Sequence, residues 1–412
     1  MDEPGTNWAG TYAYRARALH RPDTLEQLQE IVAGAERIRV LGSRHSFSDI
    51  ADSDALVSLD ALPGDVTVDH AAGTVSCAAA VRYGELAEAL HAEGLALHNL
   101  ASLPHISVAG AVATGTHGSG NASGNLATAV AGLELVTSSG ERVSAKRGDA
   151  DFDGLVVNLG ALGAVTRLVL DVEPAYEIAQ RVYEGLAWDA LFEHFDELTA
   201  CGDSVSVFTR WDETAGSVWV KARAGSERDE LFGALPATGE RHPIPGLDPI
   251  HTTRQLGVPD RWSDRLPHFQ MGFTPSAGEE IQSEYLVPRE HALAAIEAAR
   301  GLGDAVGPAL QVSEIRTIAA DRLWMSPQYA QDTVGLHFTW KREPERVGRL
   351  VAALELALGP YAARPHWGKL FLAGAATIAD RYERLADFRA LVERLDPRGA
   401  FRNRWLERHV LG

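Results

Sequence analysis

A carboxylate and a guanidinium two residues apart, in the segment ALQVSEIRTI, are the first groups in this chain that could do chemistry. An alternation of period two predicts a strand with Leu310, Val312, Glu314, Arg316 and Ile318 on one face. Because burying an unpaired charge is costly, Glu314 and Arg316 either pair with each other or face a polar cavity. A salt bridge at the edge of a sheet is the alternative that this strand alone leaves open.

Two histidines, a threonine and a lysine in the following segments extend this polar set. In TVGLHFTWK one face of the expected strand is apolar, while the other presents His337 and Thr339. A sheet with one face in solvent gives the same pattern. The segment ARPHWGK adds His366 and Lys369 after a proline. If these segments are neighbours, they line one polar pocket, in which a proton can be transferred and a developing anion stabilised.

The twenty residues ASLPHISVAGAVATGTHGSG, at 101–120, are suited to bind a large anionic group. Gly, Ala, Ser and Thr leave little side-chain bulk, so backbone N–H groups can approach the diphosphate of a nucleotide cofactor closely. The hydroxyl groups of Ser107, Thr114 and Thr116 add donors. A tight bend between two elements is the alternative. The spacing G-x-G-x-x-G is absent, so a Rossmann fingerprint is not supported.

Two parts of the chain, which differ in their predicted secondary structure, must position these segments. Up to about residue 175 the sequence predicts an α+β unit with a helix after Thr24, a helix over 83–93, strands at 37–42, 56–59, 66–69 and 74–79, a hairpin turning at 139–140 and a strand ended by Pro174. The middle of the chain predicts a helix over 188–198, a hairpin over 204–223, a loop rich in proline and glycine at 235–259, a strand ended by Pro288 and a helix that stops at Gly301 or Gly303.

Composition limits the class of protein. The chain has 412 residues, 45% of them hydrophobic, which suits a globular protein of two domains. A formal net charge of −18 argues against nucleic acid or an anionic membrane surface as a partner. Two cysteines and no apolar run of roughly 18 residues lead us to expect a cytoplasmic protein. No Cys, His or Asp stands at ligand spacing from His117, so no metal is expected.

Six segments, in order along the chain, resemble the alditol oxidases of the aldonolactone-oxidase branch of the vanillyl-alcohol oxidase flavoprotein family. They are GSRHS at 42–46, ASLPHISVAGAVATGTHGSG at 101–120, GALGAVT at 160–166, EIRT at 314–317, HFTW at 337–340 and RPHWGK at 364–369. The likeness begins at Asn7-Trp8 and runs almost to the C-terminus. No single segment is specific, whereas six in register are.

The resemblance implies an α+β fold in three parts. Residues 1–175 would form a two-subdomain FAD-binding domain of the PCMH type. Residues 176–395 would form a substrate domain, with a large antiparallel sheet that is flanked by helices and roofs the flavin. The tail, 396–412, would return to the FAD domain.

The resemblance also implies that FAD is attached covalently through His45. The positions that match FAD contacts in the family are Val40, Leu41, Gly42, Ser43, Arg44, His45, Ser46, Ser102, Ser107, Gly110, Thr114, Gly115, Thr116, His117, Ala164, Thr339 and His366. Arg44 departs from the small residue that is common in the family, and its long cation would contact a phosphate or point to solvent.

The activity implied is FAD-dependent oxidation of the terminal primary hydroxyl of alditols such as xylitol and sorbitol, giving the aldose and hydrogen peroxide. Hydride would pass to flavin N5 and dioxygen would reoxidise the flavin. The positions matching substrate contacts are Ser102, Glu314, Arg316, Thr339 and Lys369, and the expected catalytic residues are Lys369, Arg316, Glu314 and His337. Arg316 and Lys369 would stabilise alkoxide character, and Lys369 or His337 would assist proton transfer. The partners expected are the polyol and dioxygen, and the protein is expected to be a monomer.

Three other functions compete with this one. A sugar-lactone oxidase or dehydrogenase of the same branch would share the FAD domain and a similar HW-x-K segment. A cell-wall precursor reductase would have a related cofactor domain, a noncovalent flavin and a site for NADPH. A flavin-containing polyol-binding protein without activity would keep the pocket but would have no need of an electron acceptor.

Overall fold

The computed structural model describes residues 4–223, 228–272 and 280–412. Its first part is a small parallel sheet with the order β1-β3-β2, formed by β1 (Ala18–His20), β3 (Ala55–Val57) and β2 (Ile38–Val40). Helix α1 (Leu25–Gly34) begins where the capping pattern predicts, because the Thr24 side chain accepts a hydrogen bond from the Gln27 N–H. Leu28 and Val32 of this helix are fully buried and belong to the core cluster of the small sheet.

A five-stranded antiparallel sheet forms the second part. Its strand order β4-β5-β9-β7-β8 joins β4 (Val66–Asp69), β5 (Thr74–Ala78), β9 (Ala164–Asp171), β7 (Val130–Val136) and β8 (Arg142–Lys146). The helices of this part are α2 (Tyr83–Ala92), α3 (Val108–Ala113) and α4 (Phe152–Val156), and β6 (Leu95–Ala96) pairs with β10 (Glu173–Pro174). The predicted hairpin turn is confirmed: Gly140 has φ +82°, and a Cβ there would lie 2.9 Å from the Gln29 carbonyl oxygen.

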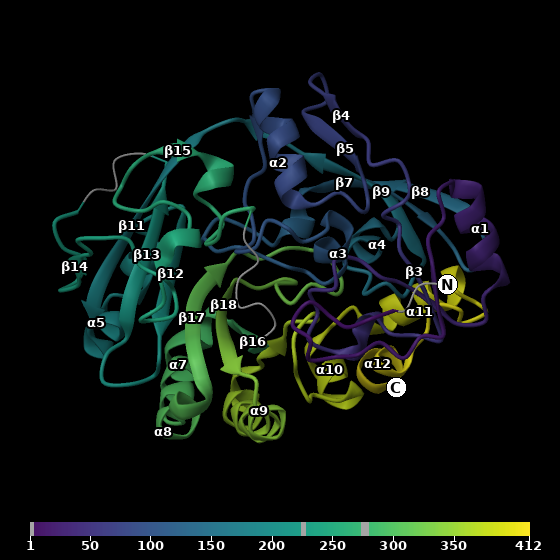
Figure 1. The fold of residues 1–412 in the computed structure, drawn as a ribbon. Coiled ribbons are helices and arrows are strands. Elements are labelled where there is room, and N and C mark those ends of the chain that lie inside the picture. Colours follow the sequence, from purple (N-terminus) through teal and green to yellow (C-terminus); the bar gives the residue numbers. More distant parts are fainter. Residues whose placement is uncertain (1–3, 224–227, 273–279) are drawn as a thin grey trace.

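A large antiparallel sheet dominates the rest of the chain (Figure 1). Its main path is β14 (Leu235–Pro236), β11 (Glu177–Leu186), β13 (Gly216–Ala222), β12 (Ser204–Thr209), β17 (Leu310–Ile318), β18 (Thr333–Lys341), β16 (Glu280–Pro288) and β19 (Arg364–Pro365), with β15 (Asp260–Arg261) paired to β11. One face packs against α5 (Trp188–Glu193), α6 (Phe195–Thr199), α7 (Ala292–Arg300), α8 (Gly303–Val306) and α9 (Pro344–Leu358). In the described ranges, no helix combines the length and the apolar character that crossing a membrane requires.

The central strand β18 is buried on both faces. Its apolar side chains, Val334 to Trp340 at every second position, belong to the core cluster beneath the helices, as predicted. His337 and Thr339 on the opposite face are also buried, with 8% and 7% of their surface exposed. The alternative of a sheet with one face in solvent is therefore wrong for this strand, because the first domain covers its polar face.

Two local predictions are corrected by the structure. A β-bulge between Leu310 and Val312 shifts the alternation, so Leu310 packs in the core on the helix side while Val312 packs with Phe208 near the cavity. The helix predicted over 188–198 is interrupted at His194, which has φ −118° and stacks on the Phe232 ring at 4.6 Å.

The C-terminal segment returns to the first domain (Figure 1). It contains α10 (Ala375–Arg381), α11 (Leu385–Leu395) and α12 (Arg404–Leu406). The Ile38 N–H donates to the Ala400 carbonyl at 2.8 Å, and the Asn403 amide donates to the Asp52 carbonyl at 2.8 Å. Because α10 and α11 also bury side chains in the core cluster of the five-stranded sheet, we propose that the return begins with α10 and not at residue 396.

Candidate active site

A cavity of about 590 Å³ lies between the FAD-type domain and the polar face of the large sheet. Among the residues selected from the sequence, those that line it are Val40, Leu41, Gly42, Ser43, Arg44, His45, Ser46, Ser102, Ser107, Gly110, Thr114, Thr116, His117, Glu314, Arg316, His337, Thr339, His366 and Lys369. Gly115 and Ala164 do not line it. Gly115 has φ +62° and a Cβ there would meet Pro327 at 3.1 Å, while Ala164 is buried in the core around α1.

His45 lines this cavity, and its imidazole ring nitrogens are not used in hydrogen bonds to described residues. The ring stacks on Trp8 at 5.3 Å and lies 4.9 Å from His105. Burial first, and then His105, lowers the pKa of His45 to about 3, so its imidazole is neutral at pH 7. A neutral, unpaired, buried ring nitrogen fits a residue that forms a bond to a cofactor.

Gly42, in the loop after β2, and Gly110, in α3, form a narrow cradle. A Cβ on Gly42 or Gly110 would lie 2.9 or 2.7 Å from the Ser107 hydroxyl oxygen, so both positions need glycine. The N–H of Ser107, which precedes α3, donates to the Ser43 hydroxyl at 3.0 Å and joins the helix to this loop. Together with the orphaned imidazole of His45, this bare backbone fits a bulky cofactor such as FAD.

Arg44 turns away from the cradle toward the N-terminal segment. Its backbone has φ +64°, where the family commonly has a small residue. The guanidinium donates to the Pro4 carbonyl at 2.6 Å and lies 5.9 Å from the centre of the Tyr14 ring. Arg44 is half-buried against the first residues described in the chain, and the choice between a phosphate contact and solvent stays a prediction.

Three adjacent strands bring the polar residues of the large sheet into one row. In the register of β17, β18 and β16, His337 lies directly opposite Glu314 on one side and Glu284 on the other. Arg316 lies opposite Gly335, where a Cβ would meet the Glu284 carboxylate at 3.2 Å. The glycine thus leaves the space through which Arg316 reaches across β18.

Glu284 holds two cations at this row. Arg316 donates through Nη2 to Glu284 Oε1 at 2.9 Å, and its Nη1 lies 3.5 Å from Glu314 Oε2. Lys369 donates through Nζ to Glu284 Oε2 at 2.6 Å. Glu284 has 1% of its surface exposed, so both ion pairs are shielded from water. The prediction that Glu314 and Arg316 pair or face a polar cavity holds in both respects.

A short hydrogen-bonded chain leads from Lys369 to Thr339. The distance from Lys369 Nζ to His337 Nδ1 is 2.7 Å, and that from His337 Nε2 to Thr339 Oγ1 is 3.0 Å. Because an ammonium group only donates, Nδ1 is the acceptor and Nε2–H donates to the threonine hydroxyl. His337 can therefore exchange a proton with Lys369 directly.

The charge states in this cluster follow from its surroundings. Burial raises the pKa of Glu284, but Arg316 and Lys369 outweigh it and hold that pKa well below the ordinary value. Burial lowers the pKa of Lys369, and Glu284 opposes the shift. Burial and the neighbouring Lys369 lower the pKa of His337 to about 4. At pH 7 the carboxylates are ionised and His337 is neutral.

His117, Glu284 and His366 have ligand-type atoms within 4.8 Å of one another. The sequence spacing gave no sign of this group, because the three residues come from separate segments. A cation bound there would face repulsion from Arg316 and Lys369, which already share the carboxylate. The expectation of no metal stays a prediction, supported by this charge balance.

Sequence reasoning missed three buried charged or titratable groups near the cavity. Glu284 is the one carboxylate of the segment QSEYLVP, for which the sequence predicts only a strand. A carboxylate within a strand, as at Glu314, is the signal that could have identified it. Lys221 and His268 are the other two groups, and they contact each other. His268 lies in a segment without a periodic pattern, so no local signal in the sequence marks it.

The neutral buried imidazoles predict acid sensitivity. Burial first of all lowers the pKa values of His117, His268 and His337 from the ordinary 6.5 to about 4. The unfolded chain binds more protons between those values, so stability falls as pH drops from 6.5 toward 4, by about 1.4 kcal/mol per pH unit for each imidazole. We expect the melting temperature to fall from pH 7 to pH 5 at constant ionic strength. The same fall is expected in the control His70→Gln, since His70 is exposed; a flat profile in the wild type would contradict the prediction.

Two family profiles match the sequence. The one described as "FAD binding domain" matches residues 16–146, which include His45 and the glycine-rich cradle. The one described as "D-arabinono-1,4-lactone oxidase" matches residues 275–409, which include the polar row and the C-terminal return. Each profile thus includes residues from one wall of the cavity.

Solved structures and curated relatives agree with this division. Cholesterol oxidase from Brevibacterium sterolicum superposes with a TM-score of 0.79 at 15% identity, covering 100% of this chain and 97% of its own. That likeness shows the fold, and the profile described as "FAD binding domain" makes the class an FAD-binding protein. Alditol oxidase from Streptomyces sp. (strain IKD472 / FERM P-14339) is 50% identical over 98% of this chain and 99% of its own. L-gulono-1,4-lactone dehydrogenase of Mycobacterium tuberculosis (strain ATCC 25618 / H37Rv) is 30% identical over 99% of each chain. The chain belongs to the alditol oxidase family of FAD-dependent oxidoreductases.

Proposed function

We propose that this enzyme oxidises the terminal primary hydroxyl group of alditols such as xylitol and sorbitol to the aldose, with dioxygen as the electron acceptor. The observation that carries the proposal is a buried cluster on the cavity that His45 also lines. Arg316, Lys369 and His337 line this cavity, and Glu284 bonds to both cations. Two cations and a neutral imidazole beside a cofactor cavity suit the loss of a proton from an alcohol. When bound, FAD supplies the hydride acceptor and passes the electrons to dioxygen.

The residues of the chain handle the proton and the developing charge. Arg316, whose pKa is raised by its carboxylate partners against the effect of burial, stays charged and stabilises the alkoxide character of the reacting oxygen. Lys369, with its lowered pKa, loses a proton more readily than an exposed lysine and can then accept the hydroxyl proton. His337 Nδ1 is the next acceptor, at 2.7 Å.

Selectivity for a polyol requires groups that bind the neighbouring hydroxyls. Glu314 accepts hydrogen bonds, while Ser102 and Thr339 both donate and accept them, and all three line the cavity. An alcohol that lacks those hydroxyls would leave part of the hydrogen-bonding capacity of these three side chains unused inside the cavity, which costs binding energy. We propose these three side chains, with Arg316 and Lys369, as the substrate-binding set.

A sugar lactone is the second candidate substrate. It is favoured by the profile match over 275–409 and by the lactone dehydrogenase relative. The decisive experiment mixes the oxidised enzyme anaerobically with xylitol, sorbitol, glycerol and gulonolactone in a stopped-flow instrument. We expect xylitol and sorbitol to bleach the flavin spectrum faster than the lactone. Bleaching by the lactone alone would replace the alditol proposal, and NADPH oxidation would point to a reductase.

We further propose that FAD is bonded covalently through His45. The support is the unpartnered, neutral imidazole beside the cradle. Precipitating the wild type in acid should carry yellow colour down with the protein, whereas the His45→Ala precipitate should be colourless. The control His70→Gln, at an exposed histidine, should behave like the wild type. Release of all flavin from the wild type under acid would refute the covalent bond.

We also propose that the enzyme is a monomer of the cytoplasm. Cys77 and Cys201 are buried and free, which suits a reducing compartment. Sedimentation velocity at several concentrations tests the oligomeric state, because a dimer would give a concentration-dependent shift in the sedimentation coefficient.

A further inference from the structure

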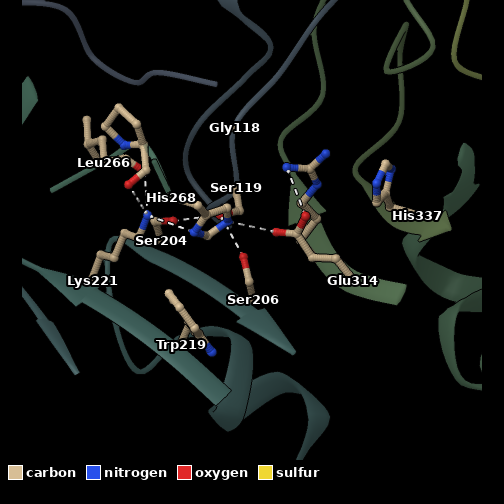
Figure 2. A network of polar contacts seen from close by, with 12 residues as sticks. Gly118, Ser119, Ser204, Ser206, Trp219, Lys221, Leu266, His268, Glu314 and His337 are labelled. Atoms are coloured by element: carbon tan, nitrogen blue, oxygen red, sulfur yellow. Dashed lines mark hydrogen bonds and ion pairs between the residues drawn. The ribbon is translucent and has the colours of Figure 1, made fainter. Parts of the chain in front are cut away.

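A second line of buried polar groups reaches the cavity from the far side of Glu314 (Figure 2). It consists of Lys221 on β13, His268 in the loop before residue 272, and Glu314 on β17. Lys221 and His268 lie outside the cluster around Glu284. Glu314 joins the two sets of residues, since its Oε1 is 3.3 Å from His268 Nε2 and its Oε2 is 3.5 Å from Arg316 Nη1.

Among the described residues, three acceptors surround the ammonium group of Lys221. Its ammonium group donates to the Leu266 carbonyl, to the Pro267 carbonyl at 3.2 Å and to His268 Nδ1 at 3.2 Å. An ammonium group has three N–H bonds and no lone pair, so these three acceptors match the charged form of the lysine. Burial lowers the pKa of Lys221 to about 7, against the effect of Glu314, so the lysine is mostly charged at pH 6. Lys221 has 1% of its surface exposed, so water does not compete for these bonds.

This arrangement fixes the tautomer of His268. Because Nδ1 accepts from Lys221, the ring proton is on Nε2, which lies 3.3 Å from Glu314 Oε1. The opposite tautomer would place a lone pair against the carboxylate and an N–H against the ammonium group. Burial, reinforced by Lys221, lowers the pKa of His268 to about 4, so the ring is neutral at pH 6 and above.

Packing holds the ring in this orientation. The imidazole meets the Phe208 ring at 5.2 Å and the Trp219 ring at 5.6 Å, with interplanar angles of 73° and 89°. The His268 N–H donates to the Ser102 carbonyl at 3.2 Å. One residue therefore contacts both Glu314, through its ring, and Ser102, through its backbone.

We propose that His268, with its tautomer fixed by Lys221, is a positioning residue. It holds the Glu314 carboxylate and the Ser102 backbone in the orientation in which both residues can bind the hydroxyl groups of the substrate. The role in substrate selection rests on the proposed polyol oxidation. His268 donates one charge-assisted hydrogen bond to Glu314, which leaves the remaining lone pairs of the carboxylate for the hydroxyls of a bound polyol.

The kinetic test uses two substitutions of His268 in the flavin-loaded enzyme. His268→Phe keeps a ring between Phe208 and Trp219 but removes the donor, and His268→Gln restores an N–H near the position of Nε2. We expect His268→Phe to raise the KM for xylitol about tenfold, with kcat changed less, because it removes a hydrogen bond to a charged group. His268→Gln should recover most of the loss. In His268→Phe, the ratio of kcat/KM for xylitol to kcat/KM for 1,2-butanediol should fall about tenfold.

The spectroscopic test does not depend on activity. In the holoenzyme labelled with ¹⁵N-histidine, at about pH 6, His268 should show a protonated Nε2 and an acceptor Nδ1, with the signals assigned by their absence in His268→Gln. Lys221→Met should shift the Nδ1 signal, because it removes the donor, whereas Lys146→Met, at an exposed lysine, should not.

The outcomes separate this inference from the proposed function. If no polyol reduces the wild-type flavin, the proposed function fails, while the tautomer measurement still decides the inference. A proton on Nδ1 of His268, or an Nδ1 signal unaffected by Lys221→Met, overturns the fixed tautomer. Unchanged xylitol kinetics in His268→Phe, in an enzyme that does oxidise xylitol, overturns the positioning role.

Discussion

Replacing Lys369 with methionine is expected to slow flavin reduction by xylitol about 10³-fold while the flavin remains attached. The substitution keeps the aliphatic stem and removes the group that bonds to Glu284 at 2.6 Å and to His337 at 2.7 Å. The reacting hydroxyl then loses one of its two cations and its nearest proton acceptor. Arg316 still pairs with Glu284, so the buried carboxylate keeps a partner and the fold is retained. Stopped-flow measurement of the anaerobic reduction rate gives the answer.

The matched control is Lys341→Met. Lys341 ends β18 on the same sheet, but its side chain is exposed and donates to the Pro308 carbonyl away from the cavity. Its reduction rate should stay within about twofold of the wild type, since it removes a surface contact. A near-normal rate in Lys369→Met would remove Lys369 from the chemistry and leave His337 as the candidate acceptor.

The second large effect is expected for Glu284→Gln. The amide keeps the shape of the carboxylate but removes the charge that holds Arg316 and Lys369 together. Breaking a buried ion pair costs about 3–5 kcal/mol, because the remaining charges lose their compensation. Glu284 also opposes the lowering of the Lys369 pKa, so its loss should lower that pKa further. We expect a lower melting temperature and a reduced activity. Because Lys369 must lose its proton before it can act as the acceptor, the acid limb of the pH–activity profile should move to lower pH.

The control for Glu284 is Glu297→Gln. Glu297 is exposed on α7 and pairs with Arg300 at 3.2 Å. The substitution therefore removes a surface ion pair, which contributes about 0–1 kcal/mol to stability. Its melting temperature and pH profile should match those of the wild type within error. If Glu284→Gln also matched the wild type in both measurements, the carboxylate would not be what organises the two cations.

Much of the fold can be predicted from the sequence because the deciding signals are local. The side chain of Thr24 caps α1 through a residue three positions on, and Gly140 turns a hairpin that only glycine fits. The alternation in β18 separates an apolar face from His337 and Thr339 over nine residues. Where a local irregularity breaks the period, as at the bulge after Leu310, the same reasoning assigns the wrong face.

The candidate site is only partly local. His45, Arg316 and Lys369 can be selected from short motifs, and the structure places all three on one cavity. Glu284 acquires its importance from partners 32 and 85 residues away, and no spacing in the sequence announces such pairs. His268 lies in an aperiodic loop, and its ring is 46 residues from Glu314 along the chain.

The sequence by itself therefore determined the strands, the glycine-rich cradle and the kinds of groups available, because periodicity and backbone freedom act within a few residues. The tertiary structure alone decided which charges meet: the order β17-β18-β16 puts Glu314, His337 and Glu284 in one row. It also decided their charge states, because burial and the nearest ion set a pKa, and both depend on how distant segments pack.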